Sequence, residues 1–159
     1  MNRKRYKPWQ RIVSIILISC FLSGCFATSE VYSGKVYYLT EKNGLHFIEI
    51  TLNGVKTKLL VDTGANKCLL DISQASTYNF NYVLLSEDNY VGLGGLLDIY
   101  IVCDYKVEEF FIPFLGADLN QVQTYFIKDG IKIAGVLGSD FLQRNKAVID
   151  FEANKLYLN

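Results

Sequence analysis

The sequence contains little histidine, little proline and no net charge. Its 159 residues include one histidine and two prolines, and 16 lysines and arginines balance 16 aspartates and glutamates. Because His46 is the only histidine, Ser-His-Asp and Cys-His catalysis is excluded unless a partner supplies the imidazole. Cysteine and histidine do not cluster at metal-ligand spacing, so we expect no metal or other cofactor. A neutral chain also gives no electrostatic reason to bind nucleic acid.

Cysteine is also scarce, with four residues at positions 20, 25, 68 and 103. The first two fall within the first 25 residues, which leaves Cys68 and Cys103 for the rest of the chain. Export would permit a disulfide between them, and two buried free thiols are an equally good interpretation. Both interpretations stay open, because spacing does not supply the geometry that a disulfide requires.

The first 25 residues have the features of an exported lipoprotein. Basic residues precede an apolar run at 12–21, which suits a secretory signal and is shorter than the about 20 residues of a membrane span. Leu22-Ser23-Gly24-Cys25 follows and resembles the lipobox of bacterial lipoproteins, in which the cysteine is lipidated. The resemblance implies a signal peptide at 1–24, a lipid on Cys25, a tether at 25–35 and a domain at 36–159. It places the protein in the bacterial cell envelope, lipid-anchored at either membrane; an uncleaved signal anchor is the alternative.

The remainder, about 135 residues, is enough for one domain and shows the period-two alternation of strands. Asn53-Gly54 lies between two such stretches and is a strong hairpin signal. A short helix is expected at 139–145, capped by Ser139 or Asp140, and a turn or single helical turn at 73–77. The fold class is therefore all-β with one short helix near the C-terminus. The predicted strands are 36–40 (an edge strand), 46–52, 55–61, 68–72, 99–102, 107–111, 122–127, 131–138, 147–151 and 155–158.

The stretch Leu59 to Ala65 delivers one carboxylate, Asp62, from an apolar strand into a turn. Burying a carboxylate is unfavourable unless hydrogen bonds satisfy it. Gly64 lets the backbone approach and donate N–H groups to that carboxylate, and the Thr63 hydroxyl can bond back into the loop. Asp-Thr-Gly alone is also an ordinary turn.

Two further segments give this loop its context. The apolar stretch Ile131 to Gly138 ends on a glycine before the predicted helix. Tyr90 to Gly95 contains three glycines, which weaken a strand interior and favour a mobile hairpin tip, with 82–89 as a connection leading to it. A phosphate-binding loop is disfavoured there, because no helix start with a lysine follows.

Together and in this order, the three segments resemble the retropepsin-like aspartic proteases, a family of single-domain acid-protease barrels. The resemblance covers about 44–158. It implies that Asp62, Thr63 and Gly64 are catalytic, that Thr63 braces one catalytic loop against its twin, and that Val136-Leu137-Gly138 packs beside that loop. Substrate binding is implied for Ala65, Tyr90, Gly92, Leu93, Gly94 and Gly95, although Tyr90 could equally pack in the core.

Peptide hydrolysis by carboxylates needs two of them around one water, one acting as base while the other, protonated, polarises the carbonyl. The chain holds one Asp-Thr-Gly, which predicts a homodimer with both Asp62 residues at a two-fold axis and a peptide or protein substrate. A catalytically silent envelope module that binds peptides or proteins is the alternative, and a structural lipoprotein with a coincidental turn is a third. Asp140 is expected to cap a helix or form a salt bridge near the dimer interface. The other acids expected in turns or caps are Asp71, Asp98, Asp104, Asp118 and Asp150.

Overall fold

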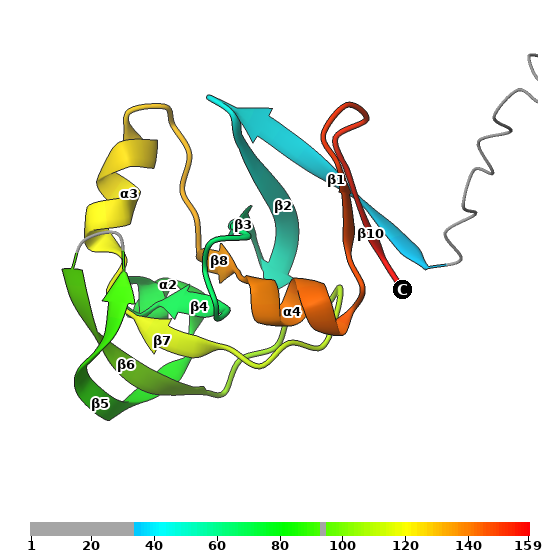
Figure 1. Cartoon of the computed structure of the whole chain (residues 1–159). Coiled ribbons are helices and arrows are strands. Elements are labelled where there is room, and N and C mark those ends of the chain that lie inside the picture. The colour runs from blue at the N-terminus through cyan, green and yellow to red at the C-terminus, as the bar shows by residue number, and fades with distance from the viewer. Residues whose placement is uncertain (1–33, 93–94) are drawn as a thin grey trace, which may run out of the picture. The chain divides into compact units, whose positions relative to one another are not determined.

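The computed structural model describes residues 34–92 and 95–159 (Figure 1). The strands of one mixed sheet follow the order β5-β6-β7-β4-β8-β3-β2-β1-β10-β9. The strands are β1 (Lys35–Lys42), β2 (Leu45–Leu52), β3 (Val55–Val61), β4 (Leu69–Asp71), β5 (Asn81–Gly92), β6 (Gly95–Cys103), β7 (Leu115–Ala117), β8 (Gly135–Leu137), β9 (Val148–Asp150) and β10 (Lys155–Leu158). The helices are η1 (Ile72–Gln74), α2 (Ala75–Tyr78), α3 (Asn120–Ile127) and α4 (Ser139–Arg144).

The predicted fold class is confirmed, since strands dominate the described residues and α4 is the predicted helix near the C-terminus. The Asn53-Gly54 turn joins β2 and β3 as predicted. Both residues have positive φ, 48° and 80°, which is the conformation that a two-residue hairpin of this type requires. The Asn53 side chain adds bonds to the backbone of Tyr78, Asn79 and Asp104, so this turn is tied to two other loops.

The end of β3 that leads to Asp62 is buried on both faces, and so is the neighbouring strand β8. Successive residues Leu59 and Leu60 of β3 belong to different apolar clusters, and so do Val136 and Leu137 of β8. β3 and β8 pair in parallel. Two-sided burial explains why 59–61 in β3 and all of β8 are apolar without alternation, whereas the more exposed start of β3 carries polar residues. It also makes the point where β3 ends a rigid support for the residues that follow.

Four predictions about individual elements are wrong. The segment 122–127 is the helix α3, because its buried side chains Gln123 and Phe126 are three residues apart and lie on one helical face. The connection expected at 82–89 belongs to β5, which pairs with β6 from Asn81 to Gly92 with two irregularities of register. The polar residues of this segment suggest a loop, but they belong to a long strand with an irregular register.

The other two errors concern strand neighbours. β1 was expected at an edge but pairs with β2 on one side and with β10 on the other, because the terminal hairpin β9–β10 folds back beside it (Figure 1). The segment 107–111 forms no strand, and only Val107 makes an isolated bridge, to Leu52. Among the described residues no helix is long and apolar enough to cross a membrane.

Candidate active site

Asp62 directly follows the last residue of β3, and its backbone is fixed by β8. Val61 pairs with Leu137, and the Asp62 N–H donates to the Leu137 carbonyl at 3.1 Å. The Asp62 side chain is half-buried. Its Oδ1 accepts the Gly64 N–H at 2.8 Å, which agrees with the expectation that this glycine donates to the carboxylate. The loop therefore presents a carboxylate whose orientation is set by its own backbone.

The loop after Asp62 is held by the segment that follows β8. The Ser139 N–H donates to the Ala65 carbonyl at 2.7 Å. Gly138 lies so close to the loop that an added Cβ would come within 2.4 Å of the Lys67 carbonyl oxygen. This close approach requires glycine at position 138. It is the physical reason for the apolar-apolar-glycine pattern noted in the sequence.

The end of the loop is tied to α4 through a thiol. The Gly138 N–H donates to Cys68 Sγ at 3.1 Å, and Sγ donates to Asp140 Oδ1 at 3.1 Å. Asp140 Oδ1 also accepts the Phe141 N–H at 2.8 Å. Cys68 is 1% exposed, and burial together with the hydrogen bond to Asp140 raises the pKa of its thiol to about 12. Cys68 is thus a neutral thiol in the folded protein.

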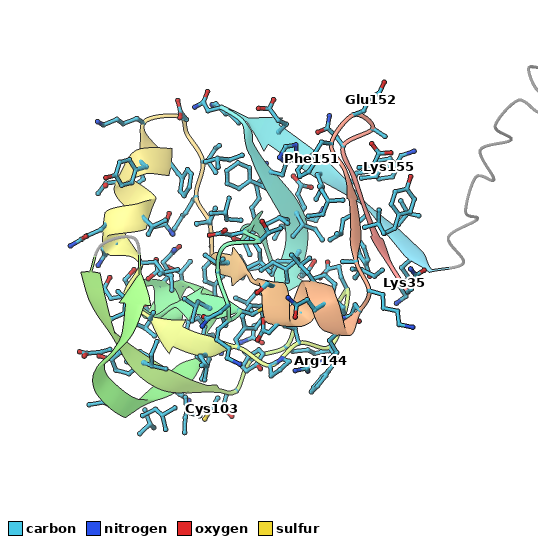
Figure 2. All side chains as sticks on the ribbon, viewed as in Figure 1. Lys35, Cys103, Arg144, Phe151, Glu152 and Lys155 are labelled. Atoms are coloured by element: carbon cyan, nitrogen blue, oxygen red, sulfur yellow. The ribbon has the colours of Figure 1, made fainter. Side chains whose placement is uncertain are left out.

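The structure decides two expectations about Asp140 and the cysteines. Asp140 and Ser139 do not cap α4, whose N-cap is Gly138 without a side-chain hydrogen bond. Asp140 accepts from the thiol and from a backbone N–H instead of forming the expected cap. The alternative, a salt bridge near the dimer interface, stays a prediction. Cys68 and Cys103 are both free; Cys68 is buried as expected of a free thiol, whereas Cys103 is exposed and lies at the periphery of the molecule (Figure 2).

The remaining predicted site residues lie in two places. Thr63 is exposed, and within the described part of this single chain its hydroxyl does not bond back into the loop; Ala65 is half-buried. Tyr90, Gly92 and Gly95 lie in the β5–β6 hairpin, where Gly92 pairs with Gly95. The hairpin tip expected from the glycines is therefore present. Two predicted tip residues, Leu93 and Gly94, lie outside the described residues.

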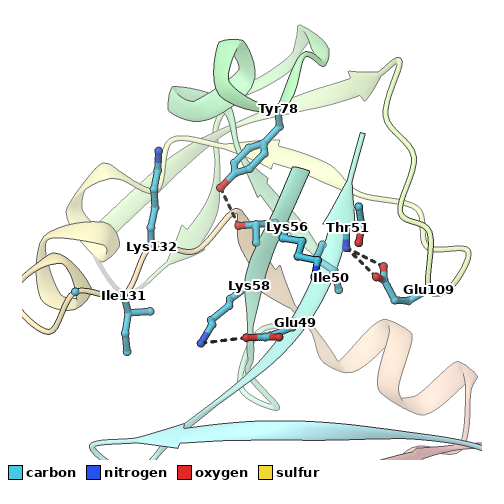
Figure 3. Close-up of a pocket in the computed structure, with 11 residues that line it drawn as sticks. Glu49, Ile50, Thr51, Lys56, Lys58, Tyr78, Glu109, Ile131 and Lys132 are labelled. Carbon is cyan, nitrogen blue, oxygen red and sulfur yellow. Dashed lines mark hydrogen bonds and ion pairs between the residues drawn. The ribbon is translucent and has the colours of Figure 1, made fainter. Parts of the chain in front are cut away.

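Two open pockets lie away from the Asp62 loop. The larger, of about 540 Å³, lies along β2 and β3 beside Glu109 and 130–132 (Figure 3). The second, of about 400 Å³, lies between Ser73 and Lys132 and includes the buried amides of Gln74 and Gln123. Neither includes Asp62. No group of acids, cysteines or histidines in the described ranges could hold a metal ion.

The two cysteines should differ strongly in reactivity. The thiolate is the nucleophile, and Cys68 is both inaccessible and held as a thiol with a pKa of about 12. We expect iodoacetamide at pH 8 to modify Cys103 in the native protein, and Cys68 only after unfolding in urea. Peptide mapping by mass spectrometry measures the two sites separately. Equal rates of modification in the native protein would contradict the burial described for Cys68.

Comparison with known families explains this arrangement. The family model described as "Aspartyl protease" matches residues 48–141, a range that begins in β2, contains the Asp62 loop and ends in α4. The chain belongs to the aspartyl protease family. In this family member the matched range covers both the segment that presents Asp62 and the segment 137–140 that braces it.

A curated protein also resembles this family member, at low sequence identity. A curated relative, the UBA domain-containing protein Mud1 of Schizosaccharomyces pombe, is 28% identical over 130 residues. That alignment covers 82% of this chain and 35% of Mud1, so the chain spans about a third of the length of that relative.

Three solved structures are similar at 16–22% identity. The retropepsin-like aspartic protease from Rickettsia conorii is 22% identical with a TM-score of 0.49, covering 80% of this chain and 93% of that one. The EIAV protease complexed with the inhibitor HBY-793 is 16% identical, TM-score 0.49, covering 70% and 98%. The retroviral protease-like domain of Ddi1 from Leishmania major is 20% identical, TM-score 0.47, covering 79% and 90%. The family assignment therefore rests on the match of the family model to residues 48–141 and not on these solved structures.

Sequence reasoning overlooked one polar cluster. Asp71, expected in a turn or cap, does cap η1 but is completely buried. Its carboxylate accepts from the side-chain amides of Gln74 and Gln123. Both amides also donate to the Ile133 carbonyl. The only signal in the sequence was a pair of glutamines near apolar stretches, which does not distinguish a buried amide from an exposed one.

Proposed function

We propose that this protein is an aspartic endopeptidase that hydrolyses peptide bonds with a water activated between the Asp62 carboxylates of two copies. The observation that carries the proposal is the Asp62 loop. A half-buried carboxylate stands at the end of a rigid strand, oriented by the Gly64 N–H and braced by 137–140. The chain is a member of the aspartyl protease family, and it contains one such loop.

The division of labour follows from the chemistry. In the dimer, one Asp62 removes a proton from the water while its protonated twin polarises the substrate carbonyl. A single chain offers only one of these groups, so a second copy completes the site. The exposed hydroxyl of Thr63 is available to the twin loop. The β5–β6 hairpin would cover the substrate and exclude water, with Tyr90 and the tip residues 92–95 against the peptide.

The same proposal includes an anchor. A signal peptide at 1–24 would direct export, and a lipid on Cys25 would hold the protein in the bacterial cell envelope; both lie outside the described residues. Anchoring raises the effective concentration of one copy for another. A weak dimer interface would then suffice for activity.

One observation favours a second candidate, a catalytically silent module that binds peptides or proteins. The curated relative is named for a UBA domain and not for proteolysis. The two candidates differ in what they require. The endopeptidase needs two copies and a water between their Asp62 carboxylates, whereas a silent binding module needs neither.

A statine-containing peptide inhibitor tests the proposal in two ways, by the number of inhibitor molecules bound per chain and by the inhibition of cleavage. Because such an inhibitor imitates the tetrahedral intermediate, we expect it to bind once per two chains and to stop the cleavage of a quenched fluorescent peptide library. Isothermal titration with the full chain in detergent measures the ratio. Binding once per chain would argue against a shared site. Absence of both binding and cleavage would favour the silent module.

A further inference from the structure

We propose that Cys68 and Asp140 are positioning residues of the catalytic loop, acting together through the proton of the Cys68 thiol. The inference rests on the proposed function of Asp62 and concerns how that side chain is placed. Within the described residues, the Asp62 carboxylate bonds to the Gly64 N–H and to neither Cys68 nor Asp140. Both act through the loop that carries Asp62.

The catalytic loop and the segment 137–140 are joined along their length by four close hydrogen bonds, besides a longer contact of 3.9 Å from Cys68 Sγ to the Gly138 carbonyl. In the first, the Asp62 N–H donates to Leu137; in the second, Ser139 donates to Ala65. The third is the Gly138 N–H to Cys68 Sγ, and the fourth is Cys68 Sγ to Asp140 Oδ1. The first two bonds join backbone to backbone. Only the last two depend on side chains, and both pass through one sulfur atom.

The Cys68 thiol therefore accepts one hydrogen bond and donates another, and we call this pair of bonds the relay. Sγ accepts a hydrogen bond from the Gly138 N–H and donates one to Asp140 Oδ1, at 3.1 Å in each case. Asp140 Oδ1 is in turn held by the Phe141 N–H in the first turn of α4. The whole chain of bonds connects the loop end to the helix. Because Cys68 is 1% exposed and Gly138 is buried, water cannot take the place of the sulfur as acceptor of the Gly138 N–H.

The relay requires that the thiol keep its proton. Burial and the bond to Asp140 raise the pKa of Cys68 to about 12, so the thiol stays a donor across the pH range in which two carboxylates could share one proton. An alanine at this position would leave the Gly138 N–H without an acceptor and Asp140 without one of its donors. The loop end would then be free to shift.

A shift of the loop end matters because the proposed reaction needs two carboxylates at a fixed separation. Displacing a reacting group by about 1 Å costs about a hundredfold in rate. Since both copies carry the same loop, each substitution moves both carboxylates. Peptide binding by the rest of the cleft is less affected. The expected signature is a lower kcat with little change in KM.

The test uses single and double variants of the full chain. Cys68→Ala and Asp140→Ala should each lower kcat by about tenfold to a hundredfold, with KM changed much less. Cys68→Ser keeps a donor and an acceptor on one side chain and should recover most of the activity, as should Asp140→Asn. The double variant should be no worse than Cys68→Ala alone, because both substitutions break the same relay.

A general loss of stability would give a different pattern. It would lower the active fraction without changing the pH dependence. A dyad whose carboxylates have moved apart should instead show a narrower bell-shaped profile of kcat, because two weakly coupled carboxylates hold a single shared proton over a smaller pH range. Cys103→Ala and Asp118→Ala are matched controls, since the first removes an exposed thiol and the second an exposed carboxylate bound to a backbone N–H.

Hydrogen exchange supplies a readout that needs no activity. The Ser139 N–H bonds to the Ala65 carbonyl, so a loosened loop should speed its exchange in Cys68→Ala but not in Cys103→Ala. Unchanged exchange at Ser139, or an unchanged kcat in both alanine variants of an active enzyme, would overturn the inference. If the wild-type chain cleaves nothing while exchange at Ser139 responds as expected, the relay stands as a loop brace and the proposed function fails.

Discussion

Asp62→Asn is expected to abolish peptide hydrolysis, lowering kcat/KM by about 10⁴-fold or more. An asparagine can neither remove a proton from the water nor give one to the substrate carbonyl. In a homodimer the substitution removes both catalytic groups at once. Cleavage of a quenched fluorescent peptide measures the loss. Residual activity within tenfold of the wild type would show that Asp62 is not the catalytic group.

The same variant should keep its fold. Asparagine retains an Oδ1 atom that can accept the Gly64 N–H, which Asp62 accepts at 2.8 Å. The side chain is half-buried, so the loss of charge leaves no large desolvation penalty. We expect far-UV circular dichroism and the thermal midpoint to stay close to those of the wild type. Asp118→Asn is the matched control, because it makes the same chemical change at an exposed turn and should leave activity unchanged.

Mixed dimers separate a shared site from a site within one chain. If wild-type and Asp62→Asn chains are co-expressed in equal amounts and pair at random, only about a quarter of the dimers carry two carboxylates. Activity per total chain should then fall to about a quarter of the wild-type value. If each chain acted alone, it would fall only to about half. The second result would contradict the two-copy mechanism even if Asp62 itself is essential.

The parts of this fold that sequence alone predicted are those with local causes. Asn53-Gly54 fixes its own turn, the apolar run at 59–61 marks a strand buried on both faces, and Gly138 marks a close backbone approach. Each of these signals lies within a few residues of the feature it specifies. Together they located the catalytic loop and the segment beside it.

The parts that sequence did not predict depend on partners far along the chain. The 122–127 segment is a helix because Gln123 and Phe126 find buried partners on one face, whereas its β-branched and aromatic residues suggest a strand. Cys68 and Asp140 are 72 residues apart, and no local pattern links a thiol to a carboxylate. The burial of Asp71 was not predicted because two of its four hydrogen-bond donors, Leu119 and Gln123, lie 48 and 52 residues further along the chain.

Asp71→Ala is expected to destabilise the domain by about 3–5 kcal/mol. The carboxylate is 0% exposed and accepts four N–H groups. Ser73 and Leu119 donate from their backbones to Oδ1, and Gln74 and Gln123 donate from their side chains to Oδ2. Alanine would leave these donors buried with fewer partners and would open a cavity between β4, η1 and α3. Urea unfolding followed by circular dichroism measures the change, with Asp118→Ala as an exposed control.

Asp71→Asn should be nearly as damaging, although it preserves the shape of the side chain. All four contacting atoms are N–H donors, so the NH2 of an asparagine amide would face N–H groups unless the Gln74 or Gln123 amide turned over and gave up its bond to the Ile133 carbonyl. If the site required only a side chain of this size, replacing aspartate by asparagine would cost little stability. A cost of less than about 1 kcal/mol for Asn would show that the donors find other acceptors.

The hydrogen bonds around Asp71 also support the strands that position the Asp62 loop. The Asp71 N–H donates to the Ala134 carbonyl, and Leu70 pairs with Gly135 at the start of β8, the strand whose other neighbour is β3. A typical domain has about 5–15 kcal/mol of stability, so losing about 3–5 kcal/mol would leave little to hold β8 in place. We therefore expect Asp71→Ala to lose peptide hydrolysis by unfolding, with a steep dependence on temperature, whereas Asp62→Asn loses it at every temperature with the fold intact.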